Sequence, residues 1–431
     1  MTRVTTWYWQ CLEGSFSAQT VWENLFAAAT ISTVLEDATN FSIVAANPLR
    51  IWQPNLGNVL KCLALMRQAQ QADGMPDYLP FTGGYVGWLG YDLSWEIEKL
   101  PYLKQDALPF PVAFWYEPQQ FVVIDHRQQL LWLATTNPSE LPQLATKIQQ
   151  PPRENFSPAR CGEIEFIPHR SAFCAMVTKA KSHIAKGDIF QANLSVRFAT
   201  TYSGSGWQIY RQLHKINPSP FACYWHTPWG EIISCSPERL LRIRDHVAET
   251  RPIAGTVAKS ADPLSDAQAL LNSRKDIAEH IMLVDLERND LGKVCRWGTV
   301  EVNELLVQEY YSHVVHLVSN VRGEIRPECS WVDVLKAVFP GGTITGCPKV
   351  RAMEIIETLE PVRRSLFYGS CGYLDRRGYL DLNILIRTLL KAGDRVWGQV
   401  GAGIVADSDP EKEWLESLQK AKAQISALSG V

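Results

Sequence analysis

The segment FVVIDHRQQLLWLAT, residues 121–135, decides the fold class of this chain. Two runs with strand-like alternation flank a polar turn from Asp125 to Gln128, a pattern that predicts a hairpin of two half-buried strands. Further β-rich runs occur at residues 230–243 and 395–406, and helical patterns lie between them. Sheets and helices mixed in this way indicate an α+β fold with an antiparallel sheet.

Composition indicates a globular protein that acts on a small molecule. The 431 residues suggest two or three domains at roughly 150 residues each. The net charge of 42 − 45 = −3 gives no overall attraction to nucleic acid or membrane. Ten cysteines lack paired spacing, and neither a signal sequence nor an apolar run of about 18 residues is found. We therefore expect a cytoplasmic protein with no membrane or nucleic-acid partner.

The main domain boundary is expected in the polar, proline-rich stretch of residues 137–162. Its composition, NPSELPQLATKIQQPPRENFSPARCG, predicts an irregular connection. The predicted domains are residues 1–150 and residues 160–428. A helix is also predicted over residues 58–72 of the first domain.

Two predicted helices carry acid pairs at helical spacing. Asp276 and Glu279 are three residues apart in the first, and Glu413 and Glu416 are three apart in the second, with Lys420 on the same face. Such a face is either solvated, with pairs such as Glu416 and Lys420, or it holds a cation. Magnesium suits the second interpretation because it takes one or two carboxylates plus water and substrate oxygens.

The stretch FPGGTITGCPKVRAMEII, residues 339–356, resembles a nucleotide phosphate loop only in part. Gly341 and Gly346 have the required spacing, but Cys347 and Pro348 stand where lysine and a hydroxyl residue belong. The apolar spacing that follows predicts a helix, and residues 342–347 would lie at its N-terminus, where free amides attract an anion. A tight turn without a ligand is the alternative.

The chain resembles the chorismate-utilising enzymes over residues 164–428, and its N-terminal part resembles the matching domain through PFTGGYVGWLGYDL. The segments that carry the resemblance, in order, are TRPIAGT, AEHIMLVDLERNDLG, YYSHVVHLVSNVRGE, FPGGTITGCPKVRAMEIIETLE, GYLDLNILIRT and GAGIVADSDPEKEWLESLQKA. The resemblance implies an antiparallel β-sandwich core with flanking helices, as in anthranilate synthase component I. It also implies that the loop helps to bind chorismate, a dicarboxylate, and no phosphate.

The resemblance implies a substrate site and a set of magnesium ligands. Arg387 and Tyr373 would hold the enolpyruvyl carboxylate, a planar acceptor suited to a guanidinium fork. The other residues implied to contact chorismate are Gly342, Thr343, Gly401, Gly403 and Lys420. Glu279 and Glu416 match direct magnesium ligands, and Asp276 and Glu413 match acids that reach the metal through water.

Glu238 and His316 match catalytic positions of the family. Glu238 matches the proposed general acid that protonates the departing C4 hydroxyl, although a surface glutamate paired with Arg239 or Arg242 is the alternative. His316 matches a site histidine of the members that add an amine, and a buried core histidine is its alternative.

Two further positions bear on which reaction the chain performs. Relatives that add water have a lysine where this chain has Gln191, and an amide cannot act as the base that activates water. Known aminodeoxychorismate synthases read PIKGT, with a lysine proposed as covalent nucleophile, whereas Ala254 offers none.

The similarity is highest to aminodeoxychorismate synthase component I, because FPGGTITG replaces the FPAGTVSG more usual in anthranilate synthase. Anthranilate synthase is the first alternative, and a non-catalytic subunit that binds chorismate is the second. No Gly-x-Cys-x-Gly elbow of a glutaminase occurs, and Cys371 in GSCGY comes nearest. We therefore expect a separate glutamine amidotransferase subunit to supply ammonia.

Overall fold

A computed structural model describes residues 5–37, 39–66, 75–151, 158–258, 274–310 and 314–429. The side chains of residues 254–258, 274–276 and 314 lie outside that description. Among the described residues, no helix has both the length and the apolar character needed to cross a membrane.

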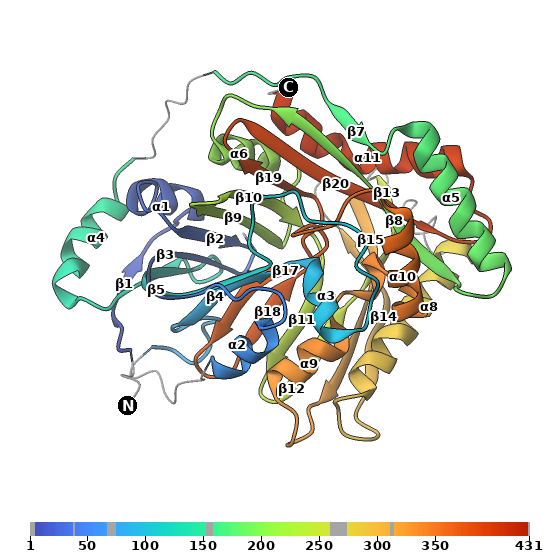
Figure 1. Cartoon of the computed structure of the whole chain (residues 1–431). Helices are drawn as coiled ribbons and strands as arrows, with labels where there is room; N and C mark the ends of the chain where they lie inside the picture. Colours follow the sequence, from blue (N-terminus) through green and yellow to red (C-terminus); the bar gives the residue numbers. More distant parts are fainter. Residues whose placement is uncertain are drawn as a thin grey trace.

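Strands dominate the structure (Figure 1). Their bounds are β1 (Tyr8–Glu13), β2 (Ser32–Glu36), β3 (Phe41–Trp52), β4 (Gly84–Leu89), β5 (Ala113–Asp125), β6 (Leu130–Thr135), β7 (Glu165–Ile167), β8 (Gln191–Thr201), β9 (Phe221–Thr227), β10 (Gly230–Ser236), β11 (Arg239–Arg244), β12 (Val247–Arg251), β13 (Ile253–Ala258), β14 (Glu301–Tyr310), β15 (Val314–Glu324), β16 (Gly346–Cys347), β17 (Ser370–Asp375), β18 (Leu380–Asn383), β19 (Thr388–Ala392) and β20 (Arg395–Ile404).

The hairpin predicted at residues 121–135 is present as β5 and β6, and the sheet branches from it. Asp125 pairs with Leu130 across the turn. One arm runs from β5 through β3, β2, β9, β10, β19 and β20 to β8. The other arm runs from β5 through β4, β17, β18, β11 and β12 to β15, which also pairs with β13 and β14. Each of these pairings is antiparallel.

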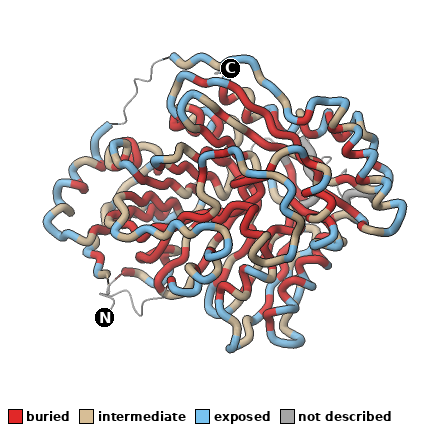
Figure 2. Tube along the Cα trace, in the orientation of Figure 1, coloured by how far each residue is buried: buried red, intermediate tan, exposed pale blue. Residues whose placement is uncertain are grey.

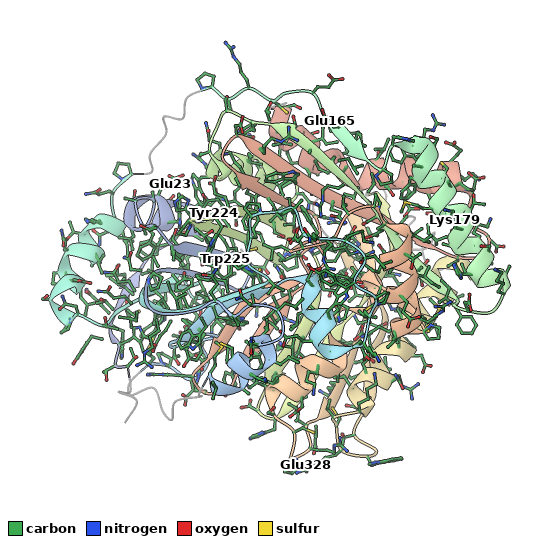
Figure 3. The ribbon with its side chains drawn as sticks, viewed as in Figure 1. Glu23, Glu165, Lys179, Tyr224, Trp225 and Glu328 are labelled. Atoms are coloured by element: carbon green, nitrogen blue, oxygen red, sulfur yellow. The ribbon has the colours of Figure 1, made fainter. Side chains whose placement is uncertain are left out.

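The two arms face each other across a large apolar core, and Figure 2 shows the buried strands gathered at the centre of the molecule. Trp88 of β4 meets Trp225 of β9 with ring centroids 5.3 Å apart, although the two strands belong to different arms. The neighbouring Tyr224 packs in a second core on the outer side of β9, and Figure 3 labels both rings. Successive side chains of one strand thus serve two cores, as the period of two requires.

Helices cover the outer face of the first arm and the open end of the second. α11 packs on β20 and against α5 and α6, while α8 packs on β13, β15 and α9. The helical elements are α1 (Ala18–Leu25), α2 (Val59–Leu65), η1 (Tyr91–Leu93), α3 (Ser94–Ile97), η2 (Pro138–Glu140), α4 (Leu141–Ile148), α5 (Arg170–Ala185), α6 (Gly206–Ile216), α8 (Arg274–Gly292), α9 (Trp331–Val338), η3 (Gly342–Ile344), α10 (Lys349–Leu359) and α11 (Pro410–Ser429).

The prediction of an irregular connection over residues 137–162 is wrong in its first part. Residues 141–148 form α4, which buries Leu144, Ala145 and Ile148 beneath α1 and β6. The polar, proline-rich composition predicts a loop, but Pro142 lies in the first turn of α4, where its missing N–H costs nothing. The predicted helix 58–72 is present as α2, and residues 67–72 lie outside the described part of the chain.

Strands from the two predicted domains pair with each other. β2 lies beside β9, and β4 lies beside β17. The domain boundary stays a prediction, but the strands on its two sides form one connected sheet.

Candidate active site

Two glycines on β20 leave a space between β20 and the neighbouring elements. Gly401 pairs with Ser195 and Gly403 with Asn193, both on β8. A Cβ on Gly403 would lie 2.4 Å from Nε2 of Gln191 and 3.0 Å from Oε1 of Glu279. Side chains from β8 and α8 therefore fill the space that these glycines leave.

Gln191 and Glu279 contact each other in this space. Nε2 of Gln191 donates to Oε1 of Glu279 at 2.8 Å. Oε1 of Gln191 and Oδ1 of Asn193 are buried and accept no hydrogen bond from the described residues. Because buried polar atoms are normally paired, these two oxygens indicate a place where a ligand or water binds.

The loop between α9 and α10 is attached to β8 next to these residues. Its Gly346 and Cys347 form β16, which pairs with β8, and Nδ2 of Asn193 donates to the Thr343 carbonyl at 3.3 Å. The glycine is required at 346, where φ is +148° and a Cβ would lie 2.2 Å from the Gln191 carbonyl. The predicted helix is present as α10, and residues 342–347 precede its cap residue Pro348, with η3 holding Gly342 and Thr343 and the two-residue β16 holding Gly346 and Cys347.

Lys349 does not face this loop as the lysine of a phosphate loop would. Its Nζ donates to Oδ2 of the buried Asp290 at 2.5 Å and to the Val338 carbonyl at 3.0 Å. A lysine held by a buried carboxylate is not available to a phosphate. This geometry supports the sequence argument against a nucleotide site.

Glu238 is a buried acid, which removes the alternative of a surface glutamate. It lies between β10 and β11 and is 4% exposed, whereas Arg239 pairs with Asp381 and Arg242 pairs with Glu249. Burial raises the pKa of Glu238 to about 8, and the Thr343 hydroxyl and the Ile253 amide oppose this rise. Glu238 is therefore protonated at neutral pH and able to donate a proton.

Arg387 and Glu287 also act on Glu238. The positive charge of Arg387 lowers the pKa of Glu238, and the carboxyl of Glu287 raises it. Oε1 of Glu287 lies 3.2 Å from the position of a Cβ on Gly342, so this acid contacts the loop directly. Arg387 and Thr343 thus lie near Glu238, and Gly342 lies next to Glu287.

The four acids predicted to hold magnesium differ in exposure. Glu279 is half-buried beside Gly403, and Glu413 is buried. Glu416 is exposed and pairs with Lys420, whose Nζ also donates to the Gly401 carbonyl at 3.0 Å. The side chain of Asp276 lies outside the described residues.

These acids fit magnesium in chemistry. Among the described residues, no three acid, histidine or cysteine side chains are grouped closely enough to hold a metal by themselves. Magnesium needs only one or two carboxylates besides water and substrate oxygens. Glu279 lies beside Gly403, and Glu416 pairs with Lys420, which donates to the Gly401 carbonyl. Both carboxylates are hard oxygen donors.

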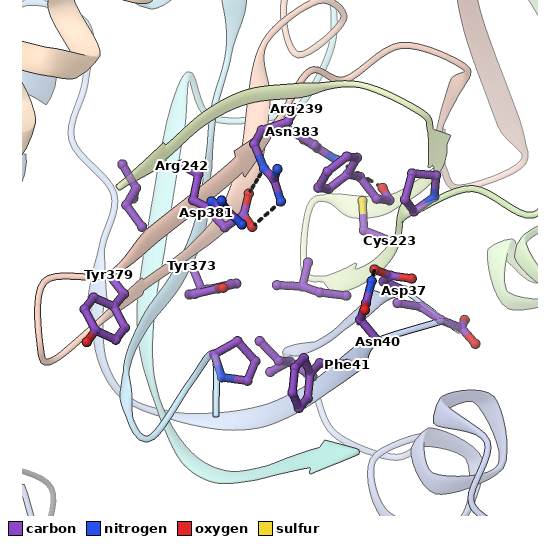
Figure 4. Close-up of a pocket in the computed structure, with 18 of the residues that line it drawn as sticks. Asp37, Asn40, Phe41, Cys223, Arg239, Arg242, Tyr373, Tyr379, Asp381 and Asn383 are labelled. Atoms are coloured by element: carbon purple, nitrogen blue, oxygen red, sulfur yellow. Dashed lines mark hydrogen bonds and ion pairs between the residues drawn. The ribbon is translucent and has the colours of Figure 1, made fainter. Parts of the chain in front are cut away.

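Tyr373 is not placed with Arg387, which corrects the sequence interpretation. It lines a separate cavity of about 300 Å³ beside Asp381, and Arg239 forms an ion pair there (Figure 4). Its ring packs edge-on against Phe81 at 5.8 Å. Because Tyr373 lies within β17, its direction is set by strand alternation, which the motif does not reveal.

Tyr368, which the sequence analysis does not name, lies beside Gly401. Its hydroxyl lies 3.0 Å from the position of a Cβ on Gly401, and within the described residues it makes no well-aligned hydrogen bond. The residue has φ of +65°, and its amide donates to the Leu385 carbonyl at 2.9 Å. Sequence reasoning missed it because a left-handed tyrosine before a strand has no sequence pattern. Asn193 was also missed, although it lies two residues after Gln191 and so shares its strand face.

A profile of the chorismate binding enzyme family matches residues 17–426. The chain belongs to this family. It is 53% identical to a Synechocystis protein described as anthranilate synthase component I-like, over 99% of this chain and 92% of that protein. It is 43% identical to aminodeoxychorismate synthase component 1 of Bacillus subtilis, over 82% of this chain and 78% of that protein.

The structure of anthranilate synthase component I from Streptococcus pneumoniae matches this chorismate binding enzyme with a TM-score of 0.81. The two chains are 31% identical, and the match covers 89% of this chain and 92% of that one. The predicted fold class and family resemblance are both confirmed.

His316 and Ala254 lie on neighbouring strands of this chorismate binding enzyme. His316 is buried on β15, between Thr256 of β13 and Glu309 of β14. Ala254 follows Ile253, whose amide donates to Oε1 of Glu238 at 3.4 Å. The side chain of Ala254 lies outside the described residues, so only its backbone is placed near the acid.

Proposed function

We propose that this chain is the component I of an aminodeoxychorismate synthase, which converts chorismate and ammonia to 4-amino-4-deoxychorismate for p-aminobenzoate and folate synthesis. The observation that favours ammonia over water as the nucleophile is the presence of Gln191 in the site. Its amide donates to Glu279 beside Gly403, where a water-adding enzyme needs a base. An amide cannot deprotonate water, whereas ammonia attacks without prior deprotonation.

Glu238 is the proposed general acid. As the C4–O bond of chorismate breaks, Glu238 gives its proton to the departing hydroxyl, which leaves as water. The nitrogen lone pair of ammonia forms the new C4–N bond, and the ammonium group so formed returns one proton to Glu238. Its raised pKa of about 8 suits both transfers, because the group exchanges protons readily near neutral pH.

The two carboxylates of chorismate have separate proposed partners. Arg387 would hold the enolpyruvyl carboxylate with Tyr368, in place of Tyr373. The residues that would contact the ring carboxylate and its surroundings are Gly342, Thr343, Gly401, Gly403 and Lys420. Glycine at 401 and 403 lets a ligand approach the backbone of β20 closely.

Glu279 and Glu416 would hold magnesium directly, and Asp276 and Glu413 would hold it through water. When bound, the metal supplies positive charge that orients the ring and neutralises its carboxylate. His316 and Ala254 would line the side of the site on which the amine enters.

We propose that a separate glutamine amidotransferase supplies the ammonia. Cys371, the cysteine nearest to a glutaminase elbow, is buried on β17 with its Sγ 3.4 Å from Sγ of Cys223. Burial raises the pKa of the Cys371 thiol well above its usual value, which is the opposite of what a nucleophile needs. All ten cysteines are free thiols, which supports a reducing cytoplasm.

Anthranilate synthase is the second candidate, and Ala254 favours it. Alanine offers no covalent nucleophile, and alanine is usual at this position in the anthranilate branch. In that reaction ammonia enters at C2 and pyruvate is then eliminated. The relatives carry both descriptions.

The product decides between these candidates. The purified chain is incubated with chorismate, magnesium chloride and an ammonium salt, and the product is identified by mass. We expect 4-amino-4-deoxychorismate, which keeps the enolpyruvyl group and yields p-aminobenzoate with an added lyase. Anthranilate with equimolar pyruvate would assign the chain to the second candidate. Chorismate binding without turnover, with ammonium and with an added glutaminase subunit, would make it a non-catalytic subunit.

A further inference from the structure

A guanidinium group is buried behind the proposed chorismate site. Arg364, just before β17, is 2% exposed. Its Nη1 donates to the Ile344 carbonyl at 2.7 Å, and its Nη2 donates to the Asn193 carbonyl at 2.7 Å. The guanidinium carbon also lies 4.6 Å from the ring centre of Tyr368. One side chain therefore contacts η3, β8 and the tyrosine before β17.

Each of these contacts is next to an atom that faces the proposed substrate. Ile344 follows Thr343, whose hydroxyl lies beside Glu238. Asn193 carries the buried Oδ1 that has no donor within the described residues. The Tyr368 hydroxyl lies beside Gly401. Moving Arg364 would therefore move three substrate-facing groups at once.

Glu360 holds Arg364 in this position. Its two oxygens accept from Nε and Nη2 of Arg364 at 3.0 and 2.8 Å, and Oε1 also accepts from the amide and hydroxyl of Ser195 at 2.8 and 2.7 Å. Ser195 pairs with Gly401 across β8 and β20. The ion pair thus fixes the glycine strand as well as the loop.

We propose that Arg364, held by Glu360, is a positioning residue that sets the distances between the chorismate-binding groups on η3, β8 and Tyr368. Lysine cannot replace it, because an ammonium group lacks the planar fork that reaches two carbonyls and a carboxylate together. This inference rests on the proposed function, since chorismate is the ligand whose binding it describes.

The neighbouring Arg363 provides a matched control. It is also 2% exposed, pairs with Asp92 at 2.9 Å and lies 4.0 Å from the ring centre of Trp95. Its side chain also contacts Lys104, Tyr102 and Glu357. Among the described residues, none of its side-chain contacts is with a proposed substrate-binding residue. The two arginines therefore differ chiefly in what they position.

The test compares Arg364→Lys with Arg363→Lys in the full chain. Each variant is characterised by its melting temperature and by steady-state kinetics with chorismate under saturating magnesium and ammonium. We expect both variants to melt at lower temperature. Arg364→Lys should raise the KM for chorismate on the order of tenfold and lower kcat, because displaced binding groups weaken both binding and orientation. Arg363→Lys should keep the KM of the wild type.

Loss of folded protein alone lowers kcat and leaves KM unchanged, so KM separates positioning from stability. Equal KM values in the two variants and the wild type would overturn the inference. If Arg364→Lys does not fold, Glu360→Gln is measured instead, with the same expected rise in KM. A wild-type chain that does not convert chorismate would reject the proposed function. If the wild type is active and Arg364→Lys has the same KM for chorismate, only the positioning role is rejected.

Discussion

Glu238 shows how one residue acquires its chemistry from burial. An exposed glutamate is ionised at neutral pH, but Glu238 lies in the interior with Glu287 nearby, and its pKa rises to about 8. If the same segment, CSPERLL, lay on the protein surface, its glutamate would be an ordinary carboxylate anion at neutral pH. The proposed role of Glu238 as general acid therefore depends on the strands that enclose the residue.

The raised pKa of Glu238 predicts a pH dependence of catalysis. Because the acid must carry its proton, kcat/KM for chorismate should decline above about pH 8. Rates are measured from pH 6 to pH 9.5 at a constant concentration of free ammonia. Glu238→Gln should lose on the order of 100-fold or more in kcat. In Glu287→Gln the decline should move to lower pH, because a group that raises the pKa of Glu238 is removed. A wild-type profile that is flat to pH 9.5 would contradict the assignment.

The same pKa shift affects stability, with a definite sign. Between the ordinary value of 4.5 and about 8, folded Glu238 keeps a proton that the unfolded chain has lost, so its contribution to stability declines as pH rises through this window. The melting temperature of Glu238→Gln relative to the wild type should therefore be higher at pH 8 than near pH 4, where the pKa shift of Glu238 no longer contributes.

At the scale of elements, β20 is shaped by its glycines. Val396, Val400, Ala402 and Ile404 pack in a core. Gly401 leaves room for Asn193 and Tyr368, and Gly403 leaves room for Gln191 and Glu279. Helix α11 then brings Lys420 and Glu416 to the same strand. Strand β20, helices α8 and α11 and the loop before α10 thus meet at the two glycine positions of β20.

Gly403→Ala tests this arrangement. The added methyl group would lie 2.4 Å from Nε2 of Gln191, the end of a flexible side chain, so the fold should survive while Gln191 and Glu279 shift. We expect kcat/KM to fall on the order of 100-fold, since shifts of about 1 Å have this effect. Circular dichroism checks the fold. Gly292→Ala, whose Cβ would meet nothing within 4 Å, is the control and should keep wild-type kinetics. Wild-type kinetics in Gly403→Ala would show that the strand does not contact the substrate.

At the scale of the whole molecule, one sheet connects the two predicted domains. β2 and β4 from the first pair with β9 and β17 from the second, and Trp88 packs on Trp225 between them. Removing either part would leave long edge strands and half of a core exposed to water. The chain should therefore behave as one cooperative unit.

Thermal unfolding tests this cooperativity. Far-ultraviolet circular dichroism follows the whole sheet, and tryptophan fluorescence follows the core that contains Trp88, Trp115 and Trp225. We expect the two midpoints to agree within about 2 °C, because coincident transitions are the mark of two-state unfolding. Two separated transitions would show that the predicted domains unfold independently.

Much of this protein was predictable from the sequence. Three predictions depend only on residues that are close in the chain. They are the hairpin at residues 121–135, the helices that carry Glu279 and Glu416, and the argument against a nucleotide phosphate loop. Local periodicity and turn chemistry act over such short separations, so the printed sequence contains the information. The helix α4 was the exception, because proline in a first turn looks like proline in a loop.

The site itself was decided by tertiary structure. Family motifs indicated Glu238, Gln191 and Arg387, but only the assembled sheet buries Glu238 and brings Gln191 to Glu279, 88 residues away. The direction of Tyr373, the placement of Tyr368 and the contacts of Arg364 depend on strand register and on packing between distant segments. Sequence by itself determined which local elements form, whereas burial and long-range contact, which determine charge state and geometry, exist only in the folded chain.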